Sequence, residues 1–495
     1  MGTLVIKKDN KSSNITNISS FTNDQKKAYE SLIEFITSDF NDKDYKRALC
    51  GPAGTGKTYL VKALITNCGL SFSRIGLAAP THKACRVLSN SIGLSQIKVN
   101  TIQSDLGLRL NFNVDNFDIK NPPFDPKGRV KISNYAVYIV DEASMIGDLS
   151  KGRFKGGLRT YLEKICIQKK CKIIYIGDDY QLPPVNEKYS SAFSTIKIDY
   201  LREIVRQDDD NPVKNILNLL RYDIEHKQHN FLNYIYSTPY AYNVDYTKGF
   251  ERLNFNQFKE KVGIYFNDER LTKDVDYVKV IGYTNDCVVY WNKLIRNSII
   301  VDSDKSIITK NDLILSYVTM VDEFNAIMLK NSEDYILKDI VNYTHPKYDL
   351  KGFMVRFISV FGGNITQPFF VLDHTDNYSL NRYVQISREM IDQATNARSG
   401  KAKYWSDYYK FKESCLLLTD IKGLDGKKIF SRDLDYGFAV TSHKSQGSTF
   451  DTVFVDVRDI IFDKYGQPRT DIDLVNRLLY VACSRCKNKL YLNYG

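Results

Sequence analysis

The chain has 495 residues, of which 43% are hydrophobic and 26% are charged, a composition typical of globular proteins. The length exceeds what one hydrophobic core supports, so several structural units are expected, and no apolar run approaches the roughly 18 residues of a membrane-spanning helix. The 69 Lys and Arg outnumber the 58 Asp and Glu, and the formal charge of +11 favours a polyanionic partner. Nine cysteines without a disulfide-like array indicate a reducing compartment. We therefore expect a soluble, cytoplasmic protein, located in the host cytoplasm if the chain is viral.

The first 20 residues contain the polar run "KKDNKSSNITNISS" and are predicted to form a flexible tail. Directly after them, Thr22 and Gln25 in "FTNDQ" have the spacing of a helix capping box. The tail is therefore expected to end where a helix begins.

A phosphate-binding loop is predicted from "LCGPAGTGKTYLV", Leu49 to Val61, because it contains the pattern G-x-x-x-x-G-K-[ST] between a strand-like run and a helical run. Backbone N–H groups in such a loop surround phosphate oxygens at the start of a helix. Lys57 can reach the β- and γ-phosphates, and the Thr58 hydroxyl can bind Mg²⁺. The predicted phosphate-binding residues are Gly51, Pro52, Ala53, Gly54, Thr55, Gly56, Lys57 and Thr58.

Two later apolar runs end in polar residues that suit nucleotide hydrolysis. "YAVYIVDEAS" ends at Asp141, placed to hold Mg²⁺ through water, and Glu142, placed to polarise the attacking water. "KIIYIGDDYQLPPV" leads to Gln181, which could sense the γ-phosphate. Small-molecule kinases do not need this third strand-end group, so the pattern favours hydrolysis coupled to movement.

The residues between Ser104 and the "YAVYIV" strand form an insertion. "LRLNFNVDNFDI" alternates apolar and polar residues, which predicts a hairpin that ends at Pro122 and Pro123.

A second parallel α/β lobe is predicted from "VKVIGYTN", "TVFVDV" and "NKLYLNY", with the helical pattern "DLVNRLLYVACSR" between the last two. It has no phosphate loop of its own. Arg485 at the end of that helix, and Arg206 in "LREIVRQ", suit a cleft that closes on a nucleotide. Residues from 316 to about 433 interrupt the lobe and are interpreted as short strands, among them "GFMVRFISVF", "PFFVLD" and "RYVQIS". The segment 207–275 has no assigned role.

Seven segments carry a resemblance to a known family: GPAGTGKT, APTHKA, VDEAS, GDDYQLPPV, LREIVRQ, TSHKSQG and YVACSR. They have the order and the spacing of superfamily-one helicases, and the chain resembles the RecD/Dda-like branch most. The resemblance implies an α/β fold with two RecA-like parallel-sheet lobes, a small β-hairpin insertion in the first and an SH3-like β insertion in the second. It further implies an ATP-dependent 5′-to-3′ DNA helicase that translocates on single-stranded DNA and separates duplex, with ATP and Mg²⁺ as cofactors.

The same resemblance implies domain boundaries. The expected units are a tail at 1–20, lobe 1A at 21–103 and 132–205, insertion 1B at 104–131, lobe 2A at 206–315 and 434–495, and insertion 2B at 316–433.

The resemblance also implies roles for single residues. Gln25 is expected to read adenine. The hydrolysis set is Lys57, Thr58, Asp141, Glu142, Gln181, Arg206 and Arg485, with Thr58 and Asp141 holding Mg²⁺. The DNA-binding set is Pro80, Thr81, His82, Lys83, Thr101, Ser104, Ser442, His443, Lys444 and Gln446, whose polar groups suit phosphate and sugar rather than bases.

Strand separation is assigned to insertion 1B by position only. Phe112 and Phe117 could stack on the junction base, or both could fill the core of the small subdomain. "KAKYWSDYYKFK" could likewise stack on bases, or it could brace insertion 1B, the candidate strand-separating pin. We favour the second interpretation.

Two other functions stay open: a non-unwinding motor subunit of a nuclease or recombination complex, and an RNA helicase of the same superfamily. Expected partners are single-stranded DNA, duplex junctions and replication or recombination proteins. The protein is expected to be a monomer and to bind no membrane.

Overall fold

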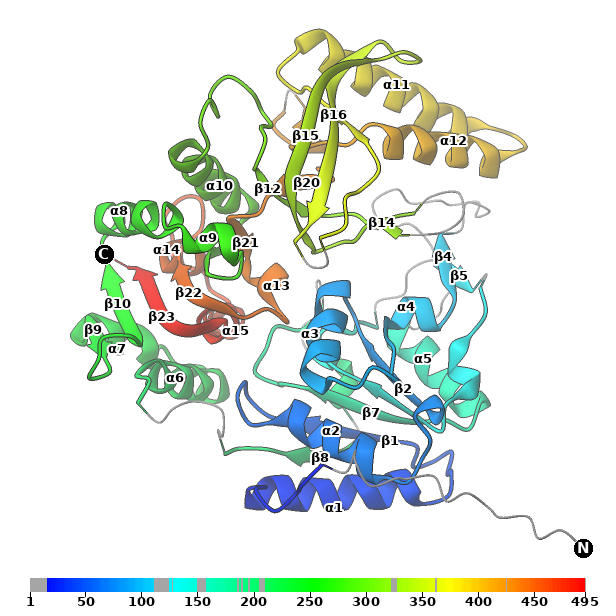
Figure 1. Cartoon of the computed structure of the whole chain (residues 1–495), viewed down its shortest axis with the longest axis vertical. Helices are drawn as coiled ribbons and strands as arrows, with labels where there is room; N and C mark the ends of the chain where they lie inside the picture. Colours follow the sequence, from blue (N-terminus) through cyan, green and yellow to red (C-terminus); the bar gives the residue numbers. More distant parts are fainter. Residues whose placement is uncertain are drawn as a thin grey trace, which may run out of the picture.

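The computed structural model describes residues 16–110, 124–126, 128–148, 157–184, 187, 190–194, 196–203, 210–321, 327–360, 363–423 and 425–494. Two lobes, each with a six-stranded sheet, face each other across the molecule, and a third unit rises from the second lobe (Figure 1). Within the described ranges, no helix combines the length and the apolar character needed to cross a membrane.

Lobe 1 is a parallel sheet in the order β3-β2-β6-β7-β1-β8. Its strands are β1 (Lys46–Cys50), β2 (Ile75–Ala79), β3 (Val99–Thr101), β6 (Val137–Val140), β7 (Lys172–Gly177) and β8 (Lys197–Tyr200). Its helices are α1 (Asn23–Thr37), α2 (Lys57–Asn67), α3 (His82–Ile92), α4 (Ile102–Asp105) and α5 (Gly157–Gln168). Apolar clusters cover both faces of the sheet, as continuous apolar strands require. The carboxyl ends of β1, β6 and β7 meet at one edge, which brings three predicted segments together.

The base of the predicted hairpin is present as β4 (Leu108–Leu110) paired antiparallel with β5 (Phe124–Pro126). The second strand follows Pro122 and Pro123 instead of ending before them, which corrects the predicted end of the hairpin. Phe112 and Phe117 lie outside the described residues.

Lobe 2 has the sheet order β21-β11-β22-β23-β10-β9, in which only the edge strand β9 is antiparallel. Its strands are β9 (Tyr240–Tyr242), β10 (Gly249–Leu253), β11 (Val278–Gly282), β21 (Ala439–Thr441), β22 (Phe450–Val455) and β23 (Cys486–Asn493). Its helices are α6 (Val213–His226), α7 (Asn230–Ser237), α8 (Phe255–Phe266), α9 (Arg270–Lys273), α10 (Asn285–Ile299), α13 (Ser442–Ser445), α14 (Val457–Ile461) and α15 (Ile472–Ser484). The segment without an assigned role thus supplies two strands and four helices of this lobe.

The third unit is built on the antiparallel sheet β17-β16-β15-β12-β20. These strands are β12 (Leu313–Ser316), β15 (Asp334–His345), β16 (Leu350–Ser359), β17 (Phe369–Leu372) and β20 (Leu434–Tyr436). Short strands accompany them: β13 (Met320–Val321), β14 (Ile327–Leu329), β18 (Ile421–Lys422) and β19 (Lys428–Phe430). β12 and β20 pair with each other inside this sheet, although residues 313–315 of β12 and all of β20 fall within the predicted lobe 2A.

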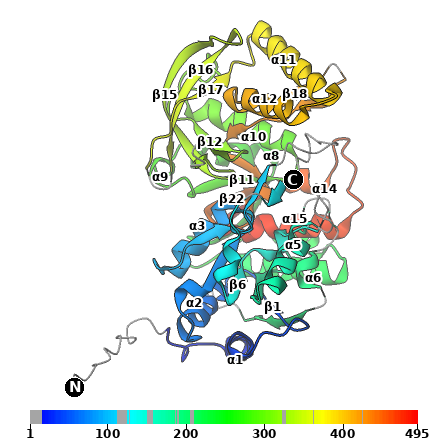
Figure 2. The same cartoon turned by 90° about the vertical axis from the view of Figure 1, so that its right-hand side faces the viewer.

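Insertion 2B also contains two helices that the sequence did not predict, α11 (Asn377–Asn396) and α12 (Lys401–Ser414). They pack side by side next to the curved sheet (Figure 2). "RYVQIS" lies in α11, so its assignment as a strand is wrong. Asp376 caps the helix through the N–H of Ser379, and buried Tyr383 and Ile386 have helical spacing.

Thr16 and Asn17, which belong to the predicted tail, contact lobe 1. The N–H of Thr16 donates to Oδ1 of Asn67 at 3.3 Å, and the hydroxyl of Tyr59 donates to the carbonyl of Asn17 at 2.9 Å. Polar side chains of α2 thus hold this backbone against lobe 1.

Candidate nucleotide and nucleic-acid site

The predicted phosphate loop connects β1 to α2 at the edge where the strands of lobe 1 end. Gly54 and Gly56 adopt left-handed conformations, with φ of 87° and 80°, which glycine tolerates without strain. A Cβ at Gly51 would lie 2.6 Å from the carbonyl oxygen of Leu201, so this position also requires glycine. The ammonium of Lys57 lies inside the loop, donating to the carbonyls of Gly51 at 2.5 Å and Pro52 at 3.0 Å.

Gln25 braces this loop from α1. Its Oε1 accepts the N–H of Thr22 at 3.0 Å, which confirms the capping box, and its Nε2 donates to the carbonyl of Thr55 at 2.9 Å. The side chain is buried. Both ends of the amide are therefore used to join the start of α1 to the phosphate loop, and the adenine-reading role stays a prediction.

The predicted acidic pair follows β6 directly. Glu142 has a φ of 50° and donates its N–H to Oδ1 of Asp141 at 2.9 Å. Burial raises the pKa of both carboxyls. For Glu142 the pKa reaches about 7, because the Asp141 charge adds to burial while Arg485 and Lys57 oppose it. Among the described residues, Oε2 of Glu142 is buried without a hydrogen-bond partner. A carboxyl with a pKa near neutrality and a free oxygen suits a group that accepts a proton from water.

The third strand end presents Asp178 and Gln181 after β7. The carboxylate of Asp178 accepts the Tyr480 hydroxyl at 2.8 Å, a contact from lobe 2 to lobe 1. Gln181 is buried, and its Oε1 accepts Nε2 of Gln446 at 3.4 Å. Gln446 follows α13 and belongs to the segment predicted to bind DNA. The segment predicted to sense the nucleotide and the segment predicted to bind DNA therefore touch.

Arg485 caps the end of α15 in lobe 2. Its guanidinium is buried, with Nε donating to the carbonyl of Val481 at 3.0 Å and Nη1 to that of Ser448 at 3.2 Å. Its charge is close enough to oppose the rise in the pKa of Glu142. The positive charge of Arg485 in lobe 2 therefore acts on a carboxyl of lobe 1. Arg206, its predicted counterpart, lies outside the described residues.

The lobe 1 part of the predicted DNA set gathers at the starts of α3 and α4. Thr81 caps α3 and follows half-buried Pro80, and Thr101 caps α4 by accepting the N–H of Ser104. The side chain of Ser104 is exposed, and burial lowers the pKa of His82. These groups can meet a sugar–phosphate chain.

Lys83 differs from the rest of this group. It is 7% exposed, and its ammonium lies 3.5 Å from the carboxylate of Asp334 in insertion 2B. The side chain is thus directed into the junction between lobe 1 and the insertion, not towards an open surface, because a buried carboxylate there attracts it.

The lobe 2 part of the set lies in and after α13. Ser442 is fully buried, with its hydroxyl donating to the carbonyl of Gly282 at 3.2 Å, so it packs inside the lobe. His443 is half-buried. The ammonium of Lys444 lies 3.9 Å from the ring centroid of Tyr317, and burial lowers its pKa to about 8. Tyr317 was not predicted from the sequence, because it comes from the start of the insertion and nothing nearby marks it.

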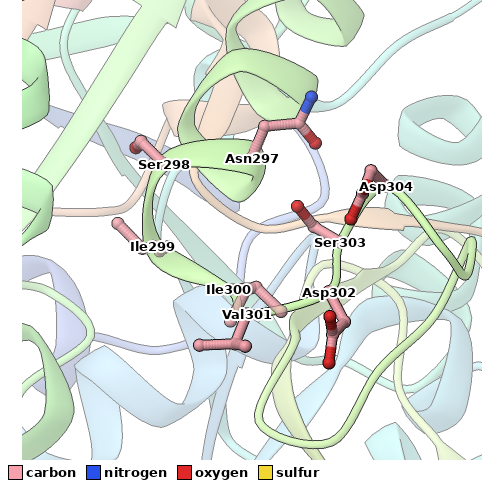
Figure 3. A pocket seen from close by; sticks show the side chains of 8 residues that line it. All are labelled: Asn297, Ser298, Ile299, Ile300, Val301, Asp302, Ser303 and Asp304. Atoms are coloured by element: carbon pink, nitrogen blue, oxygen red, sulfur yellow. The ribbon is translucent and has the colours of Figure 1, made fainter.

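A separate depression of about 380 Å³ lies at the end of α10 (Figure 3). It is lined by residues 297–304 and contains none of the predicted site residues. The candidate site is instead the junction of the two lobes described above.

Comparisons with known proteins agree with this arrangement. Residues 21–233 match the model of an AAA domain, and residues 436–493 match that of a UvrD-like helicase C-terminal domain. The ATP-dependent DNA helicase Dda of Enterobacteria phage T4 is 24% identical over 94% of this chain and 97% of its own length. An uncharacterized protein of Acanthamoeba polyphaga mimivirus is 26% identical over 95% of this chain and 99% of its own length. The chain is a superfamily-one helicase of the Dda/RecD-like branch.

In this helicase, the two matched regions correspond to the two halves of the site. The first contains the phosphate loop, the acidic pair and Gln181, and the second contains Gln446 and Arg485. A crystal structure of Pif1 helicase from Candida albicans aligns over 96% of this chain and 94% of that one, with 17% identity and a TM-score of 0.47.

Proposed function

We propose that the chain is an ATP-dependent motor that moves 5′-to-3′ along single-stranded DNA and separates duplex DNA. The observation that carries the proposal is the contact of Gln181 with Gln446, at 3.4 Å, between the nucleotide-side loop of lobe 1 and the DNA-side segment of lobe 2. A motor needs such a link, because a nucleotide can shift the arrangement of the lobes only by contacts that differ between states. The direction of movement is taken from the Dda/RecD-like resemblance.

For hydrolysis, Lys57 and Arg485 would neutralise the charge that develops on the transferred phosphoryl group, and Glu142 would accept the proton of the attacking water. The residues also fit Mg²⁺, because the Thr58 hydroxyl and the Asp141 carboxylate offer the oxygen ligands that this ion prefers. Two protein ligands are enough, since Mg²⁺ takes its other ligands from phosphate and water. Bound there, Mg²⁺ would supply positive charge to the phosphate oxygens. Arg206 would act with Arg485.

For DNA, the partly exposed groups around α3, α4 and α13 would contact phosphate and sugar, so binding would not depend on base sequence. These groups are Pro80, Thr81, His82, Thr101, Ser104, His443 and Lys444. We further propose that the protein acts as a monomer in the cytoplasm, of the host if it is viral, alongside replication or recombination proteins.

The test is an ATPase assay with no nucleic acid, single-stranded DNA or RNA, followed by unwinding of duplexes that carry a single 5′ or 3′ tail. We expect stimulation by DNA and unwinding from the 5′ tail. Stronger stimulation by RNA would favour an RNA helicase. DNA-stimulated hydrolysis without unwinding from either tail would favour a motor subunit of a larger complex.

A further inference from the structure

The loop that carries Gln181 belongs to lobe 1 by sequence and to lobe 2 by contacts. It begins at Asp178, directly after β7 of the lobe 1 sheet. Its last residue, Leu182, is fully buried in the apolar cluster of lobe 2, together with residues of α6 and α15 such as Leu220 and Leu478. The segment that follows this lobe 1 strand is therefore packed inside lobe 2.

Arg477 on α15 fixes the middle of this loop. Its Nη1 donates to the carbonyl of Asp179 at 2.6 Å and to the carbonyl of Gln181 at 3.1 Å. Its Nε donates to Asp473, one turn earlier on the same helix, at 2.9 Å. A guanidinium held by a carboxylate has little freedom left, so the two carbonyls are fixed relative to the helix.

The first residue of the loop is held by the same helix. The Tyr480 hydroxyl donates to Asp178, and the rings of Tyr180 and Tyr480 are in edge-on contact, with centroids 6.0 Å apart. Arg477 and Tyr480 are three residues apart and share a face of α15. The helix ends at Ser484 and is capped by Arg485, whose Nε donates to the carbonyl of Val481. One helix thus holds both the loop of Gln181 and the arginine whose charge acts on Glu142.

We propose that Arg477 is a positioning residue for ATP hydrolysis. It fixes the backbone of the loop that carries Gln181 relative to α15. Gln181 and Arg485 therefore reach the γ-phosphate together only when α15 packs against lobe 1. This inference rests on the proposed function, since it assigns a role within the same hydrolysis reaction. The expected consequence of losing Arg477 is a misplaced Gln181 in an otherwise intact nucleotide site, because the side-chain hydrogen bonds of the phosphate loop among the described residues go to α1 and to the loop itself rather than to α15.

The test compares Arg477→Ala, Arg477→Lys and a matched control, Arg252→Ala, with the unsubstituted protein. Arg252 also donates Nη1 to a backbone carbonyl, that of Tyr494 at 3.1 Å, but within lobe 2. The measurements are kcat and KM for ATP with saturating single-stranded DNA, DNA affinity and thermal stability. Arg477→Ala should lower kcat about 10- to 100-fold, as misplacement of a catalytic group does, with KM within about threefold.

Arg477→Lys should recover much of kcat, because a single nitrogen serves both carbonyls and an ammonium can replace it. Arg252→Ala should leave kcat unchanged. Tyr480→Phe provides a second variant that removes only the bond to Asp178 and should lower kcat in the same direction by less.

An unchanged kcat in Arg477→Ala would overturn the proposal. So would losses of kcat, DNA affinity and thermal stability in parallel, or no recovery with Lys, because either pattern indicates only a role in lobe packing. Absence of DNA-stimulated hydrolysis in the unsubstituted protein would instead refute the proposed function, and the inference with it.

Discussion

The ammonium of Lys83 on α3 lies 3.5 Å from the carboxylate of Asp334, the first residue of β15. The side chain of Lys279 in lobe 2 lies 3.8 Å from the other oxygen of the same carboxylate. One buried carboxylate, 1% exposed, therefore lies between cations from both lobes. A second pair, Arg86 with Glu333 at 3.0 Å, joins α3 to the residue directly before β15. Insertion 2B is thus ionically tied to lobe 1 next to the predicted DNA segment.

Asp334→Asn should lower the free energy of unfolding by about 3 kcal/mol, because it leaves two buried ammonium groups without their carboxylate. Urea denaturation measures the change. Asp425→Asn is the control, since it breaks an exposed pair with Lys427 and should cost less than about 0.5 kcal/mol. Equal losses in the free energy of unfolding from the two substitutions would show that the buried carboxylate stabilises the protein no more than an exposed one.

The pH dependence of hydrolysis should report Glu142. Because burial raises its pKa to about 7, the carboxylate that accepts the proton is present above this pH and is lost as the pH falls through it. We expect kcat/KM to fall about tenfold per pH unit below 7. The Glu142→Gln variant should hydrolyse ATP slowly, and its kcat/KM should not fall in this way below pH 7. A flat profile in the unsubstituted protein between pH 5.5 and pH 8, where the expected rate changes by roughly 30-fold, would argue for another base.

Lys57→Ala should abolish ATP hydrolysis and leave DNA binding largely intact. The ammonium is enclosed by the phosphate loop, while the predicted DNA contacts gather around α3, α4 and α13. ATPase rates and fluorescence anisotropy with a labelled single strand separate the two properties. Hydrolysis within a few-fold of the unsubstituted rate would mean that this loop does not drive the reaction.

Arg485→Ala and Arg206→Ala should each slow hydrolysis by about 10³-fold or more, with a weaker loss of ATP affinity, because arginine fingers act on charge that develops in the transition state. Single-turnover rates and nucleotide titrations measure the two quantities. If affinity alone falls, the arginines serve as structural ion pairs.

Binding to single strands should weaken steeply with salt and hardly vary with base sequence. With about five phosphates neutralised, the log–log slope should be about −3 to −4, and Lys444→Ala should make it shallower by about 0.7. Titrations of unrelated single strands at several salt concentrations measure both. A flat salt response, or strong preference for one sequence, would contradict backbone recognition.

Local signals predicted much of the fold and part of the site. The phosphate loop and the strand-end acids could be predicted because each lies within a short segment and parallel strands bring their ends together. α11 was missed because the short segment "RYVQIS" contains Tyr, Val and Ile, which strands favour, whereas the helical pattern is visible only over the full length of the helix and its cap at Asp376. The contact of Gln181 with Gln446, and the burial of Lys83 by Asp334, join residues distant in sequence and leave no local signal.

The place of β23 in the lobe 2 sheet has a consequence for biosynthesis. This strand lies between β22 and β10, and its Lys489 pairs with Gly249. Since translation proceeds from the N-terminus, β9 and β10 are made long before the strand that joins them to the rest of their sheet. Insertion 2B, whose sheet closes with β20, can form earlier from contacts nearer in sequence. We therefore expect lobe 2 to be the last unit to fold on the ribosome, with one edge of β10 unpaired and exposed to chaperones until β23 emerges.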